Sequence, residues 1–229
     1  MKDKKVCYSE LAYLIGIIVL AFGTAFMERA DFGISMVVAP AYLLHLNISQ
    51  YLPFFSFGMA EYVFQLFVLI LLALCMRKFK VSYLFSFVTA VIYGFALDLA
   101  IAAVAFLPGF GMAGRFAYYL VGLVFCSIGV SFLFHTYLAP EAYELFVKEL
   151  SRRFGWDIHK TKTAYDFCSC LIGILLSFAF FGLWQFEGVK LGTIVCAAVN
   201  GFLIGKISGC LEKIFVFQDR FSWRKAFEI

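Results

Sequence analysis

The sequence has few charges and few prolines for its length. Of its 229 residues, 15% are charged and four are proline, whereas about 25% of an average soluble domain is charged. Hydrophobic residues make up 63% of the chain, and the mean hydropathy is +0.91. These values exclude an ordinary soluble domain and are typical of a protein that crosses a membrane several times.

The motifs of several enzyme and metal-site classes are missing as well. The sequence has no G-x-x-x-x-G-K-[ST] phosphate loop, no G-x-S-x-G elbow, no HExxH motif, no EF-hand loop and no C-x-x-C pair. We therefore expect no enzymatic activity, no metal site, no cofactor and no disulfide framework. The net charge of +4 does not indicate nucleic-acid binding, because the basic residues lie at the ends of apolar segments.

Six apolar segments are long enough to cross a bilayer, which takes about 20 residues. They are residues 11–29, 56–76, 81–107, 116–137, 163–184 and 190–210. The first segment follows a basic start like that of a signal peptide, but no small-x-small cleavage site is evident, so we expect a permanent membrane helix. The prediction is an all-α polytopic membrane protein with one membrane domain, residues 1–229, and a cytoplasmic tail at 211–229.

Lysine and arginine lie mostly on one side of these six segments. With the N-terminus inside, the outside carries only Arg29, Arg115 and Lys190. Because cytoplasmic loops hold the excess of Lys and Arg, we expect both termini in the cytoplasm. The inner basic residues are Lys2, Lys4, Lys5, Arg77, Lys78, Lys80, Lys148, Arg152, Arg153, Lys160, Lys162, Lys213, Arg220, Arg224 and Lys225.

Two shorter segments interrupt the pattern, each directly after a spanning helix. The first lies within residues 26–49 and the second begins at residue 132. Each contains an Ala-Pro step, at Pro40 and Pro140, followed within three residues by a tyrosine. An apolar run of about 10–14 residues is too short to span and indicates a re-entrant, interfacial or buried segment. The sequence leaves open whether these two are re-entrant or interfacial.

The two halves of the chain repeat the order span, broken segment, span, span. Repeat one covers about residues 11–107 and repeat two about residues 116–210. Tyr93 and Gly94 in the third span align with Asn200 and Gly201 in the sixth. Each unit crosses three times, so the second is inverted relative to the first. Inverted repeats are typical of secondary transporters, whose sites lie near the midplane between the repeats.

The loop after the fourth span predicts a short helix that begins near Pro140 and ends at residue 155. Pairs at i,i+4 spacing, Glu144/Lys148 and Glu149 with the arginine at 153, are expected to stabilise it. One interpretation is an amphipathic helix on the inner membrane surface. The other is a helix whose Pro140 end reaches inward and lines a site.

A family resemblance rests on several features of the second half, in this order: Pro140, Arg152-Arg153-Phe154-Gly155, the basic run at 158–163, Asp166 and the glycine-rich residues 192–209. In the first half, ADFGISMVVAPAYLLHL is similar to the pattern A-x-L-G-x-S-P-W-D-x-L-x-x-G-L, except that Met36, Val37 and Val38 stand where Pro-Trp-Asp would fall. These stretches resemble the YczE/YitT-type bacterial integral membrane proteins. The resemblance implies the architecture and a location in the bacterial inner membrane, and it implies no particular biochemical function.

Polar side chains at membrane depth are the candidate substrate-binding residues, because a charge in a span is costly and usually faces a cavity or a partner. A carboxylate in an apolar helix, as at Glu61 and Asp98, needs a cation, a proton or water. The other candidates need not bind a substrate. The charged ones can extend their side chains to the membrane interface, and the histidines can serve in packing. The candidates are Glu28, Arg29, Asp31, His45, Glu61, Asp98, His135, Glu141, Tyr143, Asp166 and Asn200.

Gly201, Gly205 and Gly209 form a ridge that predicts close helix contact, either within the bundle or across a homodimer. Ala21 and Ala25 on the first span offer a face on which an ATPase partner would dock.

The leading hypothesis is a membrane transporter or solute-binding membrane protein, surrounded by lipid, that holds a small cationic or zwitterionic organic solute between the two repeats. The surplus of carboxylates also favours proton coupling. One alternative is a non-transporting membrane scaffold or accessory subunit, and another is the substrate-binding subunit of an ATPase-driven importer.

Overall fold

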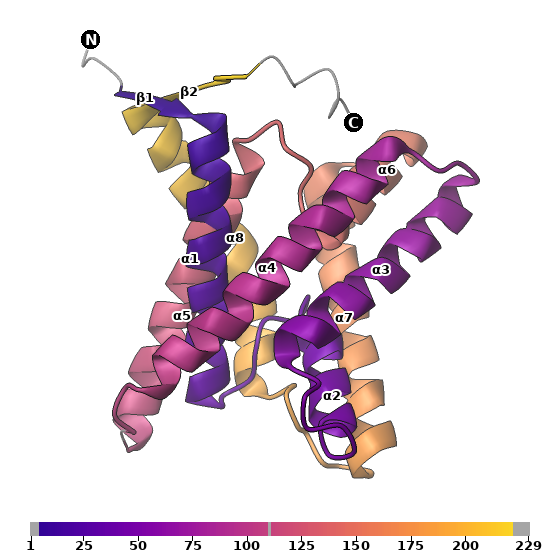
Figure 1. Ribbon diagram of the computed structural model, residues 1–229, viewed down its shortest axis with the longest axis vertical. Helices are drawn as coiled ribbons and strands as arrows, with labels where there is room; N and C mark the ends of the chain where they lie inside the picture. The colour runs from indigo at the N-terminus through magenta and orange to yellow at the C-terminus, as the bar shows by residue number, and fades with distance from the viewer. Residues whose placement is uncertain (1–4, 110, 222–229) are drawn as a thin grey trace.

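The computed structural model describes residues 5–109 and 111–221. Figure 1 shows a bundle of long, tilted helices with two short strands, β1 (Lys5–Tyr8) and β2 (Phe215–Gln218), at one end. We call this the terminal end and the opposite one the far end. Four of the basic residues used above to orient the chain, at positions 2, 4, 224 and 225, lie outside the described residues, as does the end of the predicted tail.

The described residues form eight α-helices in the order long, short, long, long, twice over. Their bounds are α1 (Ser9–Ala30), α2 (Ala39–Ile48), α3 (Phe57–Met76), α4 (Val81–Ala105), α5 (Met112–Phe134), α6 (Ala142–Phe154), α7 (Ile158–Phe181) and α8 (Leu191–Ile214). The order of elements predicted from the sequence is therefore confirmed.

Six of these helices, α1, α3, α4, α5, α7 and α8, are long and apolar enough to cross a membrane. They coincide with the six predicted spans, and the largest difference is at the start of α7, at Ile158 where residue 163 was predicted. Their outward faces are apolar, since Leu74, Phe95 and Leu99 are 68, 65 and 73% exposed. A surface of this kind suits lipid and not water. The chain is a multi-pass α-helical membrane protein.

The ends of the helices follow from local chemistry. The hydroxyl of Ser56 accepts the N–H of Met59 at 3.0 Å and caps α3, and the Asp157 carboxylate accepts the N–H of Lys160 at 3.0 Å and caps α7. Such caps satisfy backbone donors that the helix itself leaves free. At the other end of a helix, Gly155 closes α6 with φ +66°, a left-handed conformation that suits glycine.

Helices α1 and α5 run antiparallel and cross at paired glycines. A Cβ on Gly23 would lie 2.9 Å from the carbonyl oxygen of Gly122, and a Cβ on Gly129 would lie 2.8 Å from that of Gly16. No side chain fits at these positions, so the two backbones approach closely. In lipid, where the hydrophobic effect between helices is absent, such small-residue contacts hold helices together. The sequence analysis did not predict that α1 and α5 meet at these glycines.

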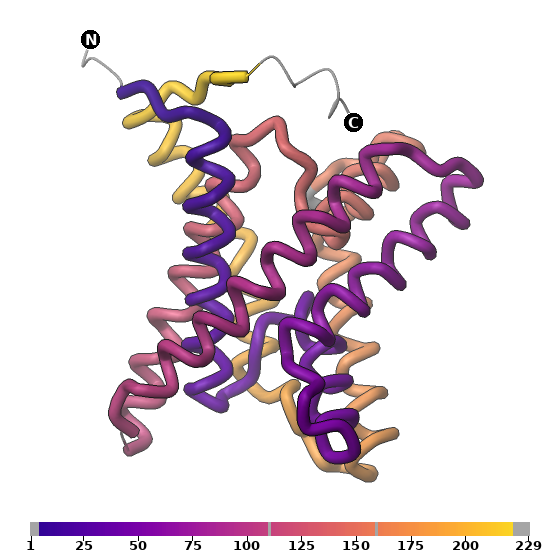
Figure 2. The backbone as a smooth tube through the Cα atoms, in the orientation of Figure 1, coloured from indigo at the N-terminus to yellow at the C-terminus, as the bar shows by residue number. Residues whose placement is uncertain are grey.

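The helix contacts of the first half have counterparts in the second (Figure 2). Helix α1 packs against α4 as α5 packs against α8, and α3 packs against α4 as α7 packs against α8. Each short helix contacts the long helix that follows it and also the corresponding long helix of the other half, so that α2 meets α7 and α6 meets α3. The two short helices therefore join the halves.

One pair of counterparts differs in closeness. Helices α3 and α4 touch at Gly58 and Gly94, where a Cβ on Gly94 would lie 2.6 Å from the carbonyl oxygen of Gly58. In α8, by contrast, a Cβ on Gly201, Gly205 or Gly209 would meet no other described atom within 4 Å. The predicted contact of this ridge within the bundle is therefore wrong, and the ridge faces away from the other helices.

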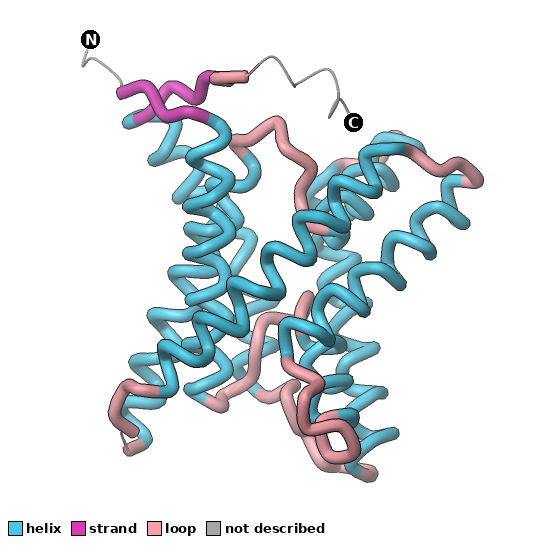
Figure 3. Tube along the Cα trace, in the orientation of Figure 1, coloured by secondary structure: helices cyan, strands magenta, loops and turns pink. Residues whose placement is uncertain are grey.

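The strands β1 and β2 form a parallel two-stranded sheet, which the sequence analysis did not predict (Figure 3). Lys5 lies opposite Phe215. Next to the sheet, the Ser9 hydroxyl donates to Asp219 Oδ1 at 2.8 Å. Residues 211–218, the start of the predicted tail, belong to α8 and β2 and are fastened to the start of α1.

Candidate functional site

Two acidic side chains from different halves of the chain lie buried beside one amide. Glu61 of α3 is 0% exposed and Glu141, directly before α6, is 3% exposed. Gln65 Nε2 donates to Glu61 Oε2 at 3.2 Å and to Glu141 Oε2 at 3.3 Å. The Tyr143 hydroxyl donates to Glu61 Oε2 at 2.9 Å. We call Glu61, Gln65, Glu141 and Tyr143 the carboxylate cluster.

Each carboxylate of the cluster keeps one oxygen that has no partner in the described part of the chain. Among the described residues, Glu61 Oε1 and Glu141 Oε1 are buried and receive no hydrogen bond. The ion pairs of the described residues all involve other carboxylates. Leaving a buried polar atom unsatisfied costs about 1–3 kcal/mol, and a native protein that retains two such atoms usually has a use for them.

The turn before α6 carries Glu141 to this depth. Pro140 has no N–H and a fixed φ, which suits the start of a helix. The Ser86 hydroxyl of α4 donates to the Pro140 carbonyl at 2.6 Å, and Ala142 N–H donates to Gln65 Oε1 of α3 at 3.1 Å. The first residues of α6 are thus fixed to two spanning helices.

A lysine and two more acidic side chains lie beside the carboxylate cluster. Lys162 Nζ lies 3.0 Å from Asp166 Oδ1 and 3.5 Å from Glu144 Oε1, and the three side chains are 12 to 21% exposed. The attraction is strong at this depth because water screens it little. The carboxylate cluster and these three side chains together contain four carboxylates and one lysine.

Both salt bridges predicted within the short helix are wrong. Glu144 pairs with Lys162 of α7 instead of Lys148. Glu149 pairs with Lys80, at 2.6 Å, and Arg153 donates instead to a backbone carbonyl of α3. The i,i+4 rule describes an isolated helix, whereas α6 packs against α3, α4 and α7. Partners on these helices and on the loop between α3 and α4 lie closer to its side chains.

A small cavity of about 30 Å³ lies between the two halves. Its volume suffices for a water or two, because one water needs about 10–15 Å³ by the same kind of measure. Apolar side chains from α1, α5 and α8 complete its wall. The polar lining residues are Thr24, Ser35, Tyr93, Glu141, Tyr143, Glu144, Lys162 and Asn200.

A larger pocket of about 290 Å³ lies beside this cavity. It is lined by the end of α5, by α6 and by the start of α7, which places it toward the terminal end. Glu144 and Lys162 line both spaces. These two side chains therefore form the boundary between the pocket, which we call the vestibule, and the central cavity.

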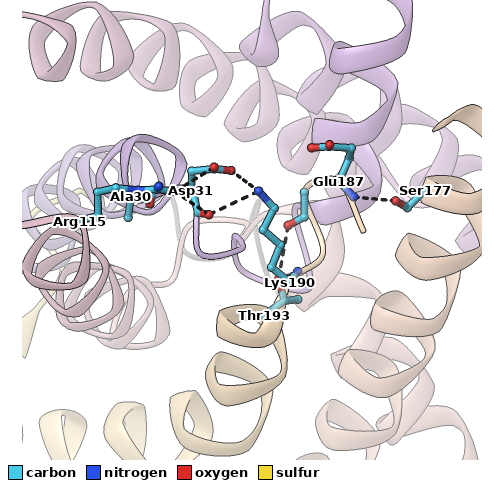
Figure 4. Close-up of polar contacts among 8 residues, drawn as sticks. Ala30, Asp31, Arg115, Ser177, Glu187, Lys190 and Thr193 are labelled. Carbon is cyan, nitrogen blue, oxygen red and sulfur yellow. Dashed lines mark hydrogen bonds and ion pairs between the residues drawn. The ribbon is translucent and has the colours of Figure 1, made fainter. Parts of the chain in front are cut away.

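At the far end, one aspartate joins three helices (Figure 4). Asp31, directly after α1, lies 2.9 Å from Arg115 of α5 and 2.5 Å from Lys190, directly before α8. The backbone supports this contact, because Gly192 N–H donates to the Phe32 carbonyl at 2.9 Å. The Asp31 side chain is 60% exposed, so solvent screens the pairs. They fasten the far ends of α1, α5 and α8 together.

The remaining predicted site residues are dispersed. Both oxygens of Asp98 are used at the start of α3, where they accept from Ser56 Oγ at 2.6 Å and Gly58 N–H at 2.8 Å. His45 Nδ1 lies 2.8 Å from the backbone carbonyl oxygen of Phe55. Glu28, Arg29 and His135 lie in or directly after the last turns of α1 and α5. Of the predicted residues, the structure gathers Glu61, Glu141, Tyr143, Asp166 and Asn200 around the cavity or directly beside it.

The sequence analysis missed several residues of this region. Gln65 lies one helical turn after Glu61 in an otherwise apolar helix, and this polar i,i+4 spacing was a signal that could have identified it. Lys162 was assigned to a basic loop, and Glu144 to a pair within α6. Only the tertiary contact between α6 and α7 brings these two together.

The environment favours the neutral acid at Glu141, which lies outside the spanning helices. Burial, with Glu144 and Glu61 close by, raises the pKa of Glu141 well above its ordinary value. Burial likewise raises the pKa of Tyr143, so its hydroxyl stays a hydrogen-bond donor. The arrangement is suited to binding a positive charge or a proton. Among the described residues, no three His, Cys, Asp or Glu side chains are grouped as a metal ion would require.

Comparisons with known proteins supply a family and no activity. The model of a family of unknown function, DUF6198, matches residues 7–209, which includes all eight helices up to residue 209 of α8. No curated protein and no solved structure matches the chain. The resemblance to YczE/YitT-type proteins stays a prediction.

Proposed function

Because the chain belongs to a family of unknown function, DUF6198, we propose its activity from the site alone: it is a membrane transporter that binds a small cationic or zwitterionic organic solute between its two halves. The observation that carries this proposal is the polar cavity between the halves, lined from both, with a vestibule beside it. Sites at membrane depth with ionisable side chains usually serve a solute, an ion or a proton.

The proposal includes two inverted repeats. It is supported by the matched helix contacts and by the reciprocal glycine contacts of α1 and α5. Gly23 meets Gly122 as Gly129 meets Gly16, which is what a two-fold axis between α1 and α5 would produce. In transporters built this way, one repeat moves against the other around a fixed site.

We further propose that α2 and α6 are re-entrant helices that enter from opposite sides of the membrane. Each begins at an Ala-Pro step, and each packs against a spanning helix of the other half. Non-helical backbone at membrane depth is tolerated where protein or a cavity surrounds it. Glu141 and Ala142 at the start of α6 are 3% and 0% exposed, in keeping with this position.

The terminal end is assigned to the cytoplasm of a bacterium. The far end carries Arg29, Arg115 and Lys190. The described basic residues at the terminal end are more numerous and include Lys5, Arg77, Lys78, Lys80, Arg152, Arg153, Lys160, Lys213 and Arg220. Cytoplasmic loops are the ones enriched in Lys and Arg. The vestibule then opens inward, while the Asp31 ion pairs hold the far end together.

The solute class follows from the charges around the cavity. Glu144 and Asp166 suit an ammonium group, and Lys162 suits the carboxylate of a zwitterion. Tyrosine rings such as that of Tyr93 add cation–π attraction. At about 290 Å³ the vestibule approaches the size of a small-molecule site, whereas the central cavity would have to widen when the solute enters.

A binding screen tests this proposal. The purified protein is heated with amines, amino acids, vitamins and nucleobases, and its unfolding midpoint is measured. A ligand at 100 times its Kd adds about 2.7 kcal/mol, a visible shift. We expect a hit that Glu144→Gln and Asn200→Ala both weaken and that the exposed Glu187→Gln leaves unchanged. A hit that none of the cavity variants alters would place the ligand elsewhere and contradict the proposal.

The second candidate is a non-transporting scaffold or accessory subunit, including the substrate-binding subunit of an ATPase-driven importer. The outward face of α8 favours it. Gly201 and Gly205 have open space there, and the exposed Lys206 has its Nζ 4.5 Å from the centroid of the Phe202 ring. A partner helix or a second copy would explain a charge on this face. Loss of assembly in Gly205→Leu, measured by light scattering while the variant stays folded, would support it.

A further inference from the structure

The carboxylate cluster joins the two halves of the chain through hydrogen bonds. Gln65 Nε2 bridges Glu61 and Glu141 across the boundary between the halves, and each carboxylate keeps an unpartnered oxygen among the described residues. Both carboxylates are at least nine-tenths buried. The amide group has two N–H donors and uses one on each carboxylate. No described lysine, arginine or histidine forms an ion pair with either of them.

Ionising all four carboxyl groups of this region at once would cost free energy, because too few positive charges lie beside them. Lys162 is the one described cation beside the cluster, and it already pairs with Glu144 and Asp166. An unpaired buried charge is so costly that the group usually takes up a proton instead. The titratable groups that face Glu61 or Glu141 from the neighbouring elements are Tyr13, Tyr93, Cys126, Tyr143, Glu144, Lys162 and Tyr165. Asp166 reaches them only through its ion pair with Lys162.

The geometry suits a proton better than a metal cation. Hard cations take about six oxygen ligands, whereas this site offers two free carboxylate oxygens. Its other polar atoms are donors or already used: Gln65 Nε2 and the Tyr143 hydroxyl point N–H and O–H groups at the carboxylates, and Gln65 Oε1 accepts from Ala142 N–H. These donors occupy Oε2 of each carboxylate, so one oxygen of each, Oε1, is left for a ligand, which is enough for a proton and too few for a metal cation.

We propose that Glu61 and Glu141 together form a proton-binding site, and that this proton is the ion that couples to solute movement. The second statement rests on the proposed transport function, whereas the first does not. The proton sits on one carboxyl oxygen of the pair and leaves to water in the vestibule, past Glu144 and Lys162. Its departure places two negative charges on one amide, which weakens the contact of α3 with α6 and favours separation of the halves.

Infrared spectroscopy tests the proton site without any solute. The C=O stretch of a protonated carboxyl is recorded on the purified protein while the pH is raised. We expect a band that persists above the range in which exposed carboxyls ionise and that is lost in Glu61→Gln and in Glu141→Gln. Glu212→Gln, an exposed acid on α8, is the matched control and should keep the band. Gel filtration confirms that each variant is folded, and Glu61→Asp provides a second variant if the amide is not tolerated.

Three outcomes overturn the proton site. They are a band that survives in both glutamine variants, a band that vanishes in Glu212→Gln, and a band displaced when sodium replaces choline in the buffer. Sodium sensitivity would assign the site to a metal cation.

Coupling is tested separately in liposomes that contain a pH dye. A gradient of a bound solute is expected to move protons in the wild type and in Glu212→Gln, and the protons moved per solute should be lost in Glu61→Gln. Solute movement without protons in the wild type overturns the coupling. If no solute moves at all, the transport proposal fails and the coupling with it, while the infrared result still decides the proton site.

Discussion

The two halves of the chain share an order of elements and differ in how tightly their last two helices pack. In the first half, α3 and α4 meet at Gly58 and Gly94. In the second half, the residue aligned with Gly94, Gly201, faces open space, and the vestibule lies beside α6 and α7. One arrangement of helices thus exists in a close and a loose form within one molecule.

This difference in packing indicates which pair of helices can separate at the lower cost in free energy. A close glycine contact in lipid is held by packing that any separation would lose, whereas Gly201, Gly205 and Gly209 of α8 make no such contact with the described residues. The charges are divided in the same way. The first half contributes Glu61 and Gln65 to the described site, and the second half contributes its lysine, Lys162, together with Glu141, Glu144 and Asp166. The second half is therefore the one whose loops and charges we expect to respond to a solute.

The largest effect is expected at Lys162, on which the charge balance of the second half depends. Lys162→Met leaves Glu144 and Asp166 without their cation, and removing one partner of a buried pair costs about 3–5 kcal/mol. Denaturant unfolding in detergent measures the loss. Lys160→Met, two residues earlier and exposed, should change stability little. Equal losses in the two variants would show that the buried pairing does not matter.

A smaller loss is expected where the halves cross. Gly23→Leu forces a side chain against the backbone of α5, and overpacking of this kind costs about 1–3 kcal/mol or more. Gly201→Leu, on the open face of α8, should leave the stability of the monomer unchanged. Thermal unfolding of both variants compares the two positions directly, and the comparison fails if Gly201→Leu is the more damaging.

The third effect is a pH dependence. Because the pKa of Glu141 is raised in the folded protein, the folded state binds its proton more tightly than the unfolded state does. Its contribution to stability is complete below the ordinary value of 4.5 and is lost as the pH rises toward the raised pKa. The unfolding midpoint of the wild type should fall over that range, and Glu141→Gln should flatten the curve. An unchanged slope in Glu141→Gln would mean that another group controls it.

The smallest effect is expected at the far end. The Asp31 side chain is 60% exposed, and exposed ion pairs contribute about 0–1 kcal/mol. Asp31→Asn should therefore cost less than about 1 kcal/mol, and added salt should shrink the difference from wild type. Glu149→Gln, which removes a 5%-exposed partner of Lys80 at the terminal end, should cost more. The reverse order would contradict the burial argument.

Sequence patterns predicted the helices well, because the length of a hydrophobic segment is a local property. The six spans and the short helix after Pro140 needed no knowledge of contacts. The site was predicted in part, since Glu61, Glu141 and Asn200 were identified only as polar residues in apolar surroundings. Their arrangement depends on which helices meet. Asp98 illustrates the difference, because nothing local showed that its oxygens would cap the start of α3.

The β1–β2 sheet and the ion pairs of α6 were missed for the same reason. Strands of four residues carry too little periodicity to identify, and their pairing joins positions near opposite ends of the chain. Glu144 forms an ion pair with a residue of α7, and Glu149 forms one with a residue of the loop before α4. The sequence of α6 alone does not predict contacts with these other elements.

The most direct test of the central claim is whether the cavity between the halves opens to each side of the membrane in turn. Cys126 lines the cavity and is 2% exposed. With the other six cysteines replaced, its reaction with a small membrane-impermeant thiol reagent is measured in vesicles of both orientations. The account predicts that Cys126 reacts from both sides and that a bound solute changes the two rates in opposite directions. A thiol that reacts from neither side, or from one side only whatever solute is present, would contradict it.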